Sequence, residues 1–309
     1  MQQKIKIGSR SSLLALWQTN YIAGLLKANG WETEIITMET KGDKVLTAPF
    51  AEIGTKGLFT EELEEQLKTG QIDIAVHSAK DMQTELGEGL DIIAYTEREE
   101  SNDVLVSLDK NFSLENTKGI VGTSSTRRKA LLKHYFPGIT TAEARGNLQT
   151  RMKKMEDGNY QAMILAYAGM HRMNYNEFIV QKLPLDIFTP AVGQGSIAIE
   201  SSLNVPDEKR KAIRQITNHA HTEYCLLTER SFLRTLQGGC SIPVFGLATL
   251  ERDTISMTGG VISLDGKDLI REHIKGNKAQ AEGLGRQLAE QLLQLGGDKI
   301  LADINKIKQ

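Results

Sequence analysis

The stretch that decides the fold is IDIAVHSAKDM, residues 72–82. It opens with an apolar run, typical of a strand that is buried on both faces of a parallel sheet. Directly after that run come an imidazole, a hydroxyl, an ammonium and a carboxylate, in His77, Ser78, Lys80 and Asp81. In an open parallel sheet, ligands bind at the carboxyl ends of the strands. We therefore expect a charged ligand to meet this strand end.

Outward from this stretch, short apolar runs alternate with helical patterns. The runs KIKIG and TEIITME flank SLLALWQTNYIAGLLKANG on the N-terminal side, and LDIIAYTE follows on the other. This alternation predicts an α/β domain with a largely parallel sheet. The segment from Thr40 to Lys56 has neither period and carries glycine, proline and lysine, so we expect a mobile loop there.

A second α/β rhythm begins near Asp103 with DVLVS and runs through GIVGTSSTRRKALLKHYF to YQAMILAYAGMHRM. The segment PAVGQGSIAIE then supplies another strand, before long helical patterns from Asp207 to Leu236. After the turn GGCSIP, three strand patterns (VFGLATL, TISMTGGVISL and LIREHI) and one helical pattern follow. This last part predicts a small third domain.

Length and composition narrow the class of protein. A chain of 309 residues is long enough for two or three domains. The formal net charge of −2 gives no reason to expect nucleic acid or an anionic membrane as a partner. The N-terminus has no apolar signal region, no run is long enough to span a bilayer, and two cysteines are too few for a disulfide scaffold. We expect a soluble cytoplasmic protein.

Arginines recur after the predicted strands, at positions that we expect to be loops. Their guanidinium groups suit carboxylates or phosphates, and helix N-termini at the same sheet edge add backbone donors. Each one alone is more often a solvated surface residue, but several at one kind of position favour a polyanionic ligand. They are Arg10, Arg127, Arg128, Arg145, Arg151 and Arg172.

The stretch GTSSTRR opens a predicted helix, and Ser124 or Ser125 either caps that helix or binds an anion, two roles that are compatible. Two nucleotide-binding motifs are absent. GTKGLF lacks the phosphate-loop spacing, and GQG in AVGQGS opens a strand instead of a strand-to-helix turn. A nucleoside triphosphatase and a dinucleotide-binding enzyme are therefore unsupported.

The cysteines and histidines have different interpretations. His219, His221 and Cys225 lie close in HAHTEYC, but too few further ligands accompany them, so we predict no metal site. Cys225 falls in a helical apolar pattern and is an inert core candidate. Cys240 lies in a turn with two glycines, where its thiol is either accessible to an electrophile or a small hydrophobic filler.

Together these residues resemble one known family, hydroxymethylbilane synthase, also called porphobilinogen deaminase. The resemblance runs nearly from end to end, through motifs in one order. They are GSRSSLLALWQ, GTKGLFTEELE, DIAVHSAKDM, VGTSSTRR, ARGNLQTR, LAYAGMHR, PAVGQGSIAIE and GGCSIP.

The resemblance implies a monomeric enzyme of tetrapyrrole biosynthesis with three α/β domains. The first two are arranged like a type II periplasmic binding protein, with a double chain crossover that returns GSIAIE to the first domain. The implied domains are 1–98 with 196–217 (carrying the catalytic aspartate), 99–195 (the arginine-rich anion site) and 218–309 (a small α/β sheet domain with the cofactor cysteine).

The resemblance also implies the chemistry. The family joins four porphobilinogen molecules head to tail with loss of ammonia, priming the chain on a dipyrromethane cofactor that is held through a cysteine thioether, here Cys240. Loss of ammonia leaves an azafulvenium cation, and Asp81 matches the aspartate that stabilises this cation and handles the protons. Without the resemblance, Asp81 is a helix cap, a surface acid or the one anion in a cationic crevice.

Further site residues carry over by the same resemblance. Because each substrate ring bears an acetate and a propionate, guanidinium forks suit the growing chain. The residues implied to contact the cofactor are Ser12, Lys80, Asp81, Ser125, Arg127, Arg128 and Arg145. The residues implied to contact the substrate are Arg10, Lys56, Ser78, Arg151 and Arg172.

This chain departs from the family pattern at a few positions. Glu52 stands where lysine is common, which puts any cationic contact from that position in doubt. Ala79 replaces a common methionine, and MQT after Asp81 replaces a segment that commonly begins with V-P. We expect altered loop packing with activity retained.

A second hypothesis is a non-catalytic anion-binding module of the periplasmic-receptor type. Such a module would need Arg10 and the other arginines but neither Asp81 nor Cys240. The lack of a signal-like N-terminus counts against it.

Overall fold

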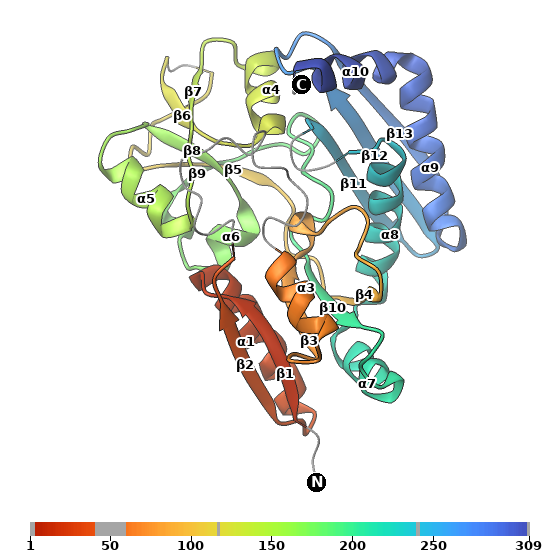
Figure 1. Ribbon diagram of the computed structural model, residues 1–309. Coiled ribbons are helices and arrows are strands. Elements are labelled where there is room, and N and C mark those ends of the chain that lie inside the picture. The colour runs from red at the N-terminus through yellow and green to blue at the C-terminus, as the bar shows by residue number, and fades with distance from the viewer. Residues whose placement is uncertain (1–3, 41–59, 116–117, 239–241, 308–309) are drawn as a thin grey trace. The chain divides into compact units, whose positions relative to one another are not determined.

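The computed structural model contains two compact units, drawn together in Figure 1. It describes residues 4–40, 60–115, 118–238 and 242–307. Within those ranges, the first unit holds 4–40, 60–99 and 195–223, and the second holds the remainder. The predicted mobile loop, with Glu52 and Lys56, and the cysteine Cys240 lie outside the described residues. No helix in the described ranges is both long enough and apolar enough to cross a membrane.

The first unit is built on a five-stranded sheet with the order β2-β1-β3-β10-β4. β2, β1 and β3 are parallel, whereas β10 is antiparallel to β3 and β4. The bounds are Ile5–Arg10 (β1), Thr33–Met38 (β2), Ile74–Ser78 (β3), Leu90–Tyr95 (β4), Ile197–Ser202 (β10), and, for the helices, Leu13–Ala28 (α1), Glu61–Lys68 (α3) and Asp207–Thr217 (α7).

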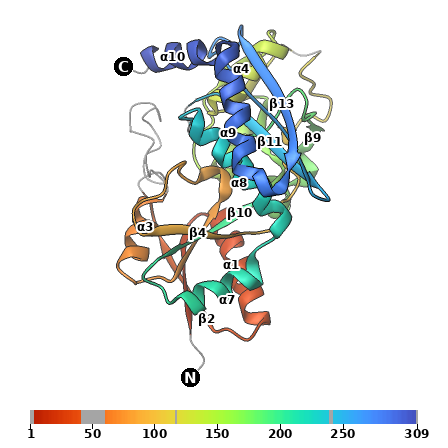
Figure 2. The ribbon, with the colours of Figure 1, turned by 90° about the vertical axis from the view of Figure 1, so that its right-hand side faces the viewer.

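Different helices cover the two faces of this sheet, because successive side chains of a strand point to opposite faces. Ile74 and Val76 of β3 pack into a cluster with side chains of α1 and α7, whereas Ala75 between them packs with Leu63 and Leu67 of α3. Figure 2 shows α3 on one side of the strands and α1 with α7 on the other. The expectation that β3 is buried on both faces is confirmed.

The second unit contains a five-stranded sheet with the order β7-β6-β8-β5-β9. Its bounds are Asp103–Ser107 (β5), Ile120–Gly122 (β6), Thr140–Ala142 (β7), Ala162–Ala166 (β8), Ile179–Lys182 (β9), and, for the helices, Thr126–Tyr135 (α4), Leu148–Glu156 (α5) and Tyr167–Arg172 (α6). β6 is parallel to β7 and β8, whereas β5 is antiparallel to β8 and β9. The prediction of two largely parallel α/β sheets is therefore confirmed.

The chain crosses twice between the two five-stranded sheets, and each of these sheets holds one antiparallel strand as a result; a third change of unit, after Glu223, leads to the third sheet. β5, the first strand after the first crossing, lies between β8 and β9, and β10, the first strand after the second crossing, lies between β3 and β4. Because β10 contains the run IAIE, the returning strand is the one that the family resemblance implied. The double crossover is confirmed.

The two crossing segments pair at their first-unit ends. The backbone N–H of Glu99 donates to the carbonyl of Gly195, with an N–O distance of 3.2 Å. Gly195 has φ +97°, and a Cβ atom there would lie 2.4 Å from the carbonyl oxygen of Glu99. Only glycine adopts this conformation at so close an approach without strain.

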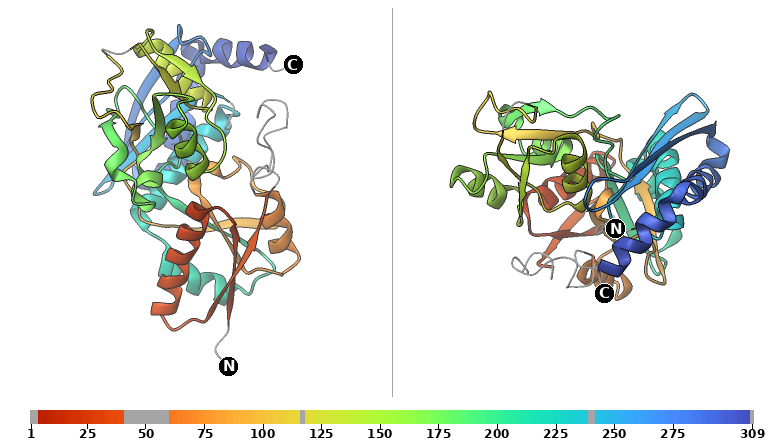
Figure 3. Two further views of the ribbon diagram at one scale, coloured as in Figure 1. Left: turned by 90° about the vertical axis from the view of Figure 1, so that its left-hand side faces the viewer. Right: turned by 90° about the horizontal axis from the view of Figure 1, so that it is seen from above.

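A third, antiparallel sheet of order β11-β12-β13 completes the second unit. Its bounds are Val244–Glu251 (β11), Thr254–Ile262 (β12), Leu269–Asn277 (β13), and, for the helices, Ala220–Thr235 (α8), Ala281–Leu292 (α9) and Asp298–Ile307 (α10). The right-hand view of Figure 3 shows the helices of this layer along one face of the blue strands. The predicted small third sheet domain is thus present.

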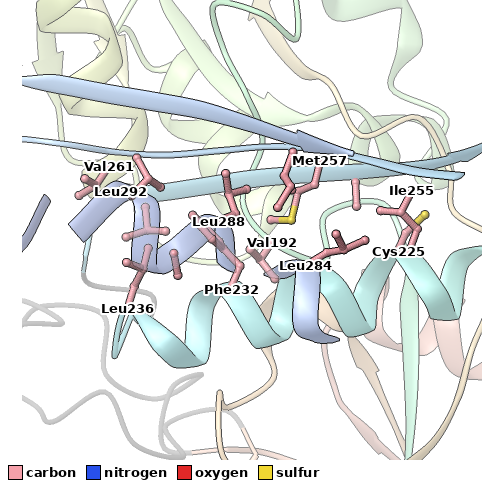
Figure 4. Close-up of a cluster of buried hydrophobic side chains, with 14 of the residues drawn as sticks. Val192, Cys225, Phe232, Leu236, Ile255, Met257, Val261, Leu284, Leu288 and Leu292 are labelled. Atoms are coloured by element: carbon pink, nitrogen blue, oxygen red, sulfur yellow. The ribbon is translucent and has the colours of Figure 1, made fainter. Parts of the chain in front are cut away.

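The core of this layer lies between its helices and its sheet. In Figure 4, Phe232 of α8, Leu284 and Leu288 of α9, and Ile255 and Met257 of β12 point into one cluster. A second cluster joins this layer to the preceding sheet of the same unit, because Phe245 of β11 packs with residues of α4 and β8. The domain boundary between residues 217 and 218 stays a prediction.

Candidate active site

The carboxyl ends of two parallel strands carry the candidate acid and its neighbours. β1 ends at Arg10 and β3 ends at Ser78, and the two strands pair in parallel, so both ends lie at one edge of the first sheet. A single 3₁₀ turn, Ala79–Asp81, follows β3 directly. Lys80 and Asp81 are both half-buried. The edge therefore presents ionisable groups, as the sequence predicts.

The turn that carries Asp81 is held by its apolar neighbours. Ala79 and Met82 are 6% and 5% exposed, so the residues on either side of Lys80 and Asp81 point into the protein. The backbone N–H of Ala79 donates to the carbonyl of Ser196, at 2.9 Å. The acid is thus presented on an anchored turn.

The serines at this edge have internal partners. The Ser12 hydroxyl is the N-cap of α1 and accepts from the backbone N–H of Ala15. The Ser78 hydroxyl accepts from Nε2 of the buried Gln18 at 2.9 Å. Gln18 was not predicted as a site residue, and its position within the apolar helix pattern explains why.

The second unit carries the arginine pair on the first turn of α4, directly after β6. Nη2 of Arg127 lies 2.8 Å from Oδ2 of Asp103, and Nη2 of Arg128 lies 2.7 Å from Oδ1 of the same carboxylate. Nε2 of Gln194 also donates to Asp103, at 2.9 Å. Two guanidinium groups thus share one internal carboxylate, which leaves one positive charge uncompensated within this group.

Burial and charge together set the protonation of this group. Burial opposes ionisation of Asp103, but the charges of Arg127 and Arg128, with hydrogen bonds from Arg128 and Gln194, outweigh it and hold the pKa of Asp103 well below its usual range. Burial lowers the pKa of Arg127, and Asp103 counteracts this effect. Since an arginine pKa lies far above neutrality, the Arg127 guanidinium stays charged.

The N-terminus of α4 also carries hydrogen-bond donors that remain available to a ligand. Nε of Arg127 and the hydroxyl of Thr126 are buried and have no hydrogen-bond partner among the described residues. The Ser125 hydroxyl is the N-cap of α4 and accepts from the N–H of Arg128, so the predicted cap is confirmed and the hydroxyl proton can still be donated. These donors fit a ligand with carboxylate groups.

The remaining arginines of this unit lie near the ends of β7 and β8. Nε of Arg145 lies 3.2 Å from Oε2 of Glu143, and Nε of Arg151 donates to the carbonyl of Gly146 at 2.8 Å. Arg172, the last residue of α6, is buried. Burial raises the pKa of Glu143, but Lys129, Ser124 and Arg145 lower it by more, so its pKa falls below the usual range.

The expectation that the arginines lie on loops is wrong for most of them. Arg127, Arg128, Arg151 and Arg172 belong to helices, and Arg10 is the last residue of a strand. Helices α4 and α5 begin within a few residues of the preceding strands because Ser125 and Asn147 cap them. Positions that look like loops in the sequence are therefore first turns.

Sequence reasoning missed the acidic and amide partners of these arginines. Asp103 opens a buried strand and Gln194 lies in the GQG motif, where only a dinucleotide fingerprint was considered. A carboxylate at the start of an otherwise apolar strand was the available signal, because such a group needs a buried partner. Glu143 carries no comparable signal.

The cysteine and histidine predictions have different outcomes. Cys225 is a buried thiol in the core cluster of the third sheet, which confirms it as a core residue. Nδ1 of His219 lies 2.9 Å from the hydroxyl of Thr222, close to the start of α8. Within the described ranges, no group of three or more His, Cys, Asp or Glu side chains is placed to hold a metal ion.

Comparisons with known proteins identify the same family along nearly the whole chain. Residues 5–210 match the family model described as porphobilinogen deaminase, dipyromethane cofactor binding domain, and residues 223–294 match porphobilinogen deaminase, C-terminal domain. The porphobilinogen deaminase of Cytophaga hutchinsonii is 53% identical over 308 residues, which is 99% of this chain and 98% of the relative. That of Desulfosudis oleivorans is 48% identical over 305 residues, 98% of each chain.

A solved structure with a likeness to this chain is the second substrate binding domain of a putative amino acid ABC transporter from Streptococcus pneumoniae. It has a TM-score of 0.43 and 14% identity, and the alignment covers 69% of this chain and 91% of that one. The two family models and the near-complete coverage of the relatives identify the family. This chain belongs to the porphobilinogen deaminase family.

Proposed function

We propose that this protein joins four porphobilinogen molecules head to tail into linear hydroxymethylbilane, with release of ammonia, in tetrapyrrole biosynthesis. Family membership supports the reaction. The observation that carries the proposal within the structure is the Arg127–Arg128 pair, whose two guanidinium groups share a single internal carboxylate. Such a group keeps net positive charge for a ligand that brings its own carboxylates.

The arginines are assigned to carboxylate binding. Porphobilinogen carries an acetate and a propionate, so every added ring brings two more carboxylates. We assign Arg10, Lys56, Ser78, Arg151 and Arg172 to the substrate. Charge-assisted hydrogen bonds of this kind are about twice as strong as neutral ones.

Asp81 is assigned the proton transfers. Its carboxyl group gives a proton to the leaving amine, which departs as ammonia, and the resulting carboxylate balances the positive charge left on the substrate. When the new carbon–carbon bond forms, this carboxylate takes the proton that the attacking pyrrole carbon releases. A positioned acid–base group of this kind contributes roughly 10²–10⁴-fold in rate.

The cofactor implied by the family is dipyrromethane. When bound, it supplies the pyrrole carbon from which the product grows. We assign its covalent attachment to Cys240 and its remaining contacts to Ser12, Lys80, Asp81, Ser125, Arg127, Arg128 and Arg145. The uncommitted Nε of Arg127 and hydroxyl of Thr126 support this fit, because both are buried donors with no protein acceptor among the described residues.

We also propose a cytoplasmic monomer with three domains, at the boundaries that the family resemblance implies. Light scattering on the purified protein tests the monomer, and localisation of the tagged full chain tests the compartment.

Intact-protein mass spectrometry combined with a porphobilinogen consumption assay tests the function. The expected result is a covalent mass increase of two pyrrole units that disappears in Cys240→Ala, together with turnover of porphobilinogen by the wild-type protein. An unmodified mass in freshly made, folded protein that binds pyrrole carboxylates without consuming porphobilinogen would instead support the anion-binding module.

A further inference from the structure

A hydrogen-bonded triad ties the turn of Asp81 to the start of helix α3. Nε2 of Gln83 donates to the Thr60 hydroxyl at 2.9 Å and to Oε1 of Glu64 at 2.7 Å. The Thr60 hydroxyl in turn donates to the same Glu64 oxygen, at 2.6 Å. Thr60 and Glu64 are 2% and 8% exposed, so these bonds form away from water.

The triad completes the anchoring of the Asp81 turn on its C-terminal side. On the N-terminal side, the N–H of Ala79 is bonded to Ser196 of the segment that leads into β10. On the C-terminal side, Met82 is buried and Gln83, the second residue after Asp81, is bonded to α3. The two half-buried ionisable residues therefore sit on a turn that is held at both ends by different elements.

The Gln83 amide supplies donors to two acceptors, one of them a buried carboxylate oxygen. Removing a partner of a buried charged group costs more than removing a neutral surface bond, because that group loses its compensation for burial.

We propose that Gln83 is a positioning residue for Asp81: its amide fixes the turn against α3 so that the carboxylate is held where proton transfer occurs. The inference rests on the proposed role of Asp81. Gln83 acts on the reaction through the turn and does not contact the substrate. A small displacement of a reacting group is enough to slow an enzyme strongly, so loss of the tether should reduce kcat.

The experiment compares Gln83→Ala, Gln83→Glu and the exchanged double variant Gln83→Glu/Glu64→Gln in the full-length, cofactor-loaded protein. In Gln83→Ala we expect kcat to fall by about tenfold, the effect of losing one such hydrogen bond, with KM and the covalent cofactor mass unchanged. Gln83→Glu places two carboxylates opposite each other and should lower kcat further than Gln83→Ala does. The exchanged double variant restores an amide opposite a carboxylate and should recover most of the kcat of the wild type.

Gln71→Ala is the matched control, because Gln71 is an exposed glutamine of the same unit, between α3 and β3. It should leave kcat unchanged. If Gln83→Ala fails to fold, the inference is tested by comparing the kcat of Gln83→Glu with that of the exchanged double variant. A positioning role predicts that the exchange restores kcat.

An active wild-type protein with unchanged kcat in Gln83→Ala would overturn this inference alone. Failure of the exchanged double variant to regain kcat over Gln83→Glu would do the same. A wild-type protein without turnover or without the covalent mass increase would overturn the proposed function, and the role of Gln83 with it.

Discussion

The Nη2 atom of Arg127 lies 2.8 Å from Oδ2 of Asp103, and both side chains are almost completely removed from water. Asp103 begins β5, the first strand after the chain enters the second unit, and Arg127 lies on the first turn of α4. Nη1 of Arg127 also donates to the carbonyl of Thr189 at 2.9 Å. The guanidinium group is therefore oriented before any ligand binds, which reduces the entropy lost on binding.

Asp103→Asn should lower the free energy of unfolding by about 3–5 kcal/mol, because two buried guanidinium groups would lose their shared counter-charge. Urea denaturation monitored by circular dichroism measures the change. Asp186→Asn, at an exposed aspartate of the same unit, is the control and should change stability by less than about 0.5 kcal/mol. A stability loss in Asp103→Asn no larger than that of the control would contradict a stabilising role for the ion pair.

The difference in stability between wild type and Asp103→Asn should depend on pH in one direction. The pKa of Asp103 is depressed in the folded protein, so its contribution is fully present above the unfolded-state pKa, about 4 for aspartate. As pH falls below that value, protonation favours the unfolded state and the advantage of the wild type shrinks. Unfolding curves at pH 7, 5 and 3 should show an equal gap at the first two values and a smaller gap at the third.

Asp81→Asn should lower kcat by roughly 10²–10⁴-fold, because the amide keeps the shape of the side chain but cannot exchange protons. KM should change far less. Steady-state porphobilinogen consumption measures both constants, and Glu85→Gln, at an exposed acid just beyond the turn, is the control. Near wild-type turnover in Asp81→Asn would remove Asp81 from the mechanism.

Substitution of the two cysteines should have different effects on stability and on the covalent cofactor. Cys225→Ala removes a buried thiol from the core between α8 and the third sheet, so it should cost about 0.5–3 kcal/mol of stability and keep the covalent cofactor. Cys240→Ala should abolish the covalent mass increase. Intact mass and thermal unfolding of both variants check this, and a cofactor that persists in Cys240→Ala but disappears in Cys225→Ala would reverse the assignment.

Gly195→Ala should destabilise the protein by about 1–3 kcal/mol or more, because the position has φ +97° and a Cβ atom would meet the backbone of Glu99. Gly24→Ala is the matched control within α1, where a Cβ atom meets nothing within 4 Å. That substitution should stabilise the helix by about 0.5–1 kcal/mol. Thermal unfolding should therefore move in opposite directions for the two variants, and a shift in the same direction would argue against the strain at Gly195.

Local patterns predicted the elements well where one face or one end determines them. The apolar run before His77 is a doubly buried strand, and Ser125 caps the helix that opens in GTSSTRR. Cys225 is a core residue, as its place in a helical apolar pattern indicates. In these cases the evidence lies within a few residues along the chain, since side-chain alternation and capping are local effects.

The partners of the charged groups could not be predicted in the same way. Asp103 and Arg127 are 24 residues apart in the sequence, and Glu200 and His77 are 123 apart, yet Oε2 of Glu200 lies 3.0 Å from Nε2 of His77. Gln83 reaches Glu64 only because α3 packs beside β3. Nothing in the local pattern around any of these residues specifies its partner.

The amino-acid sequence by itself determined the α/β class, the buried strand that ends at Ser78, and, through its ordered motifs, the family. Only the tertiary structure decided that β10 enters the first sheet between β3 and β4, and that the Arg127–Arg128 pair is neutralised in part by Asp103. The reason is physical: periodicity and capping act between near neighbours in the chain, whereas strand order and the compensation of buried charge are settled by which distant segments share a core.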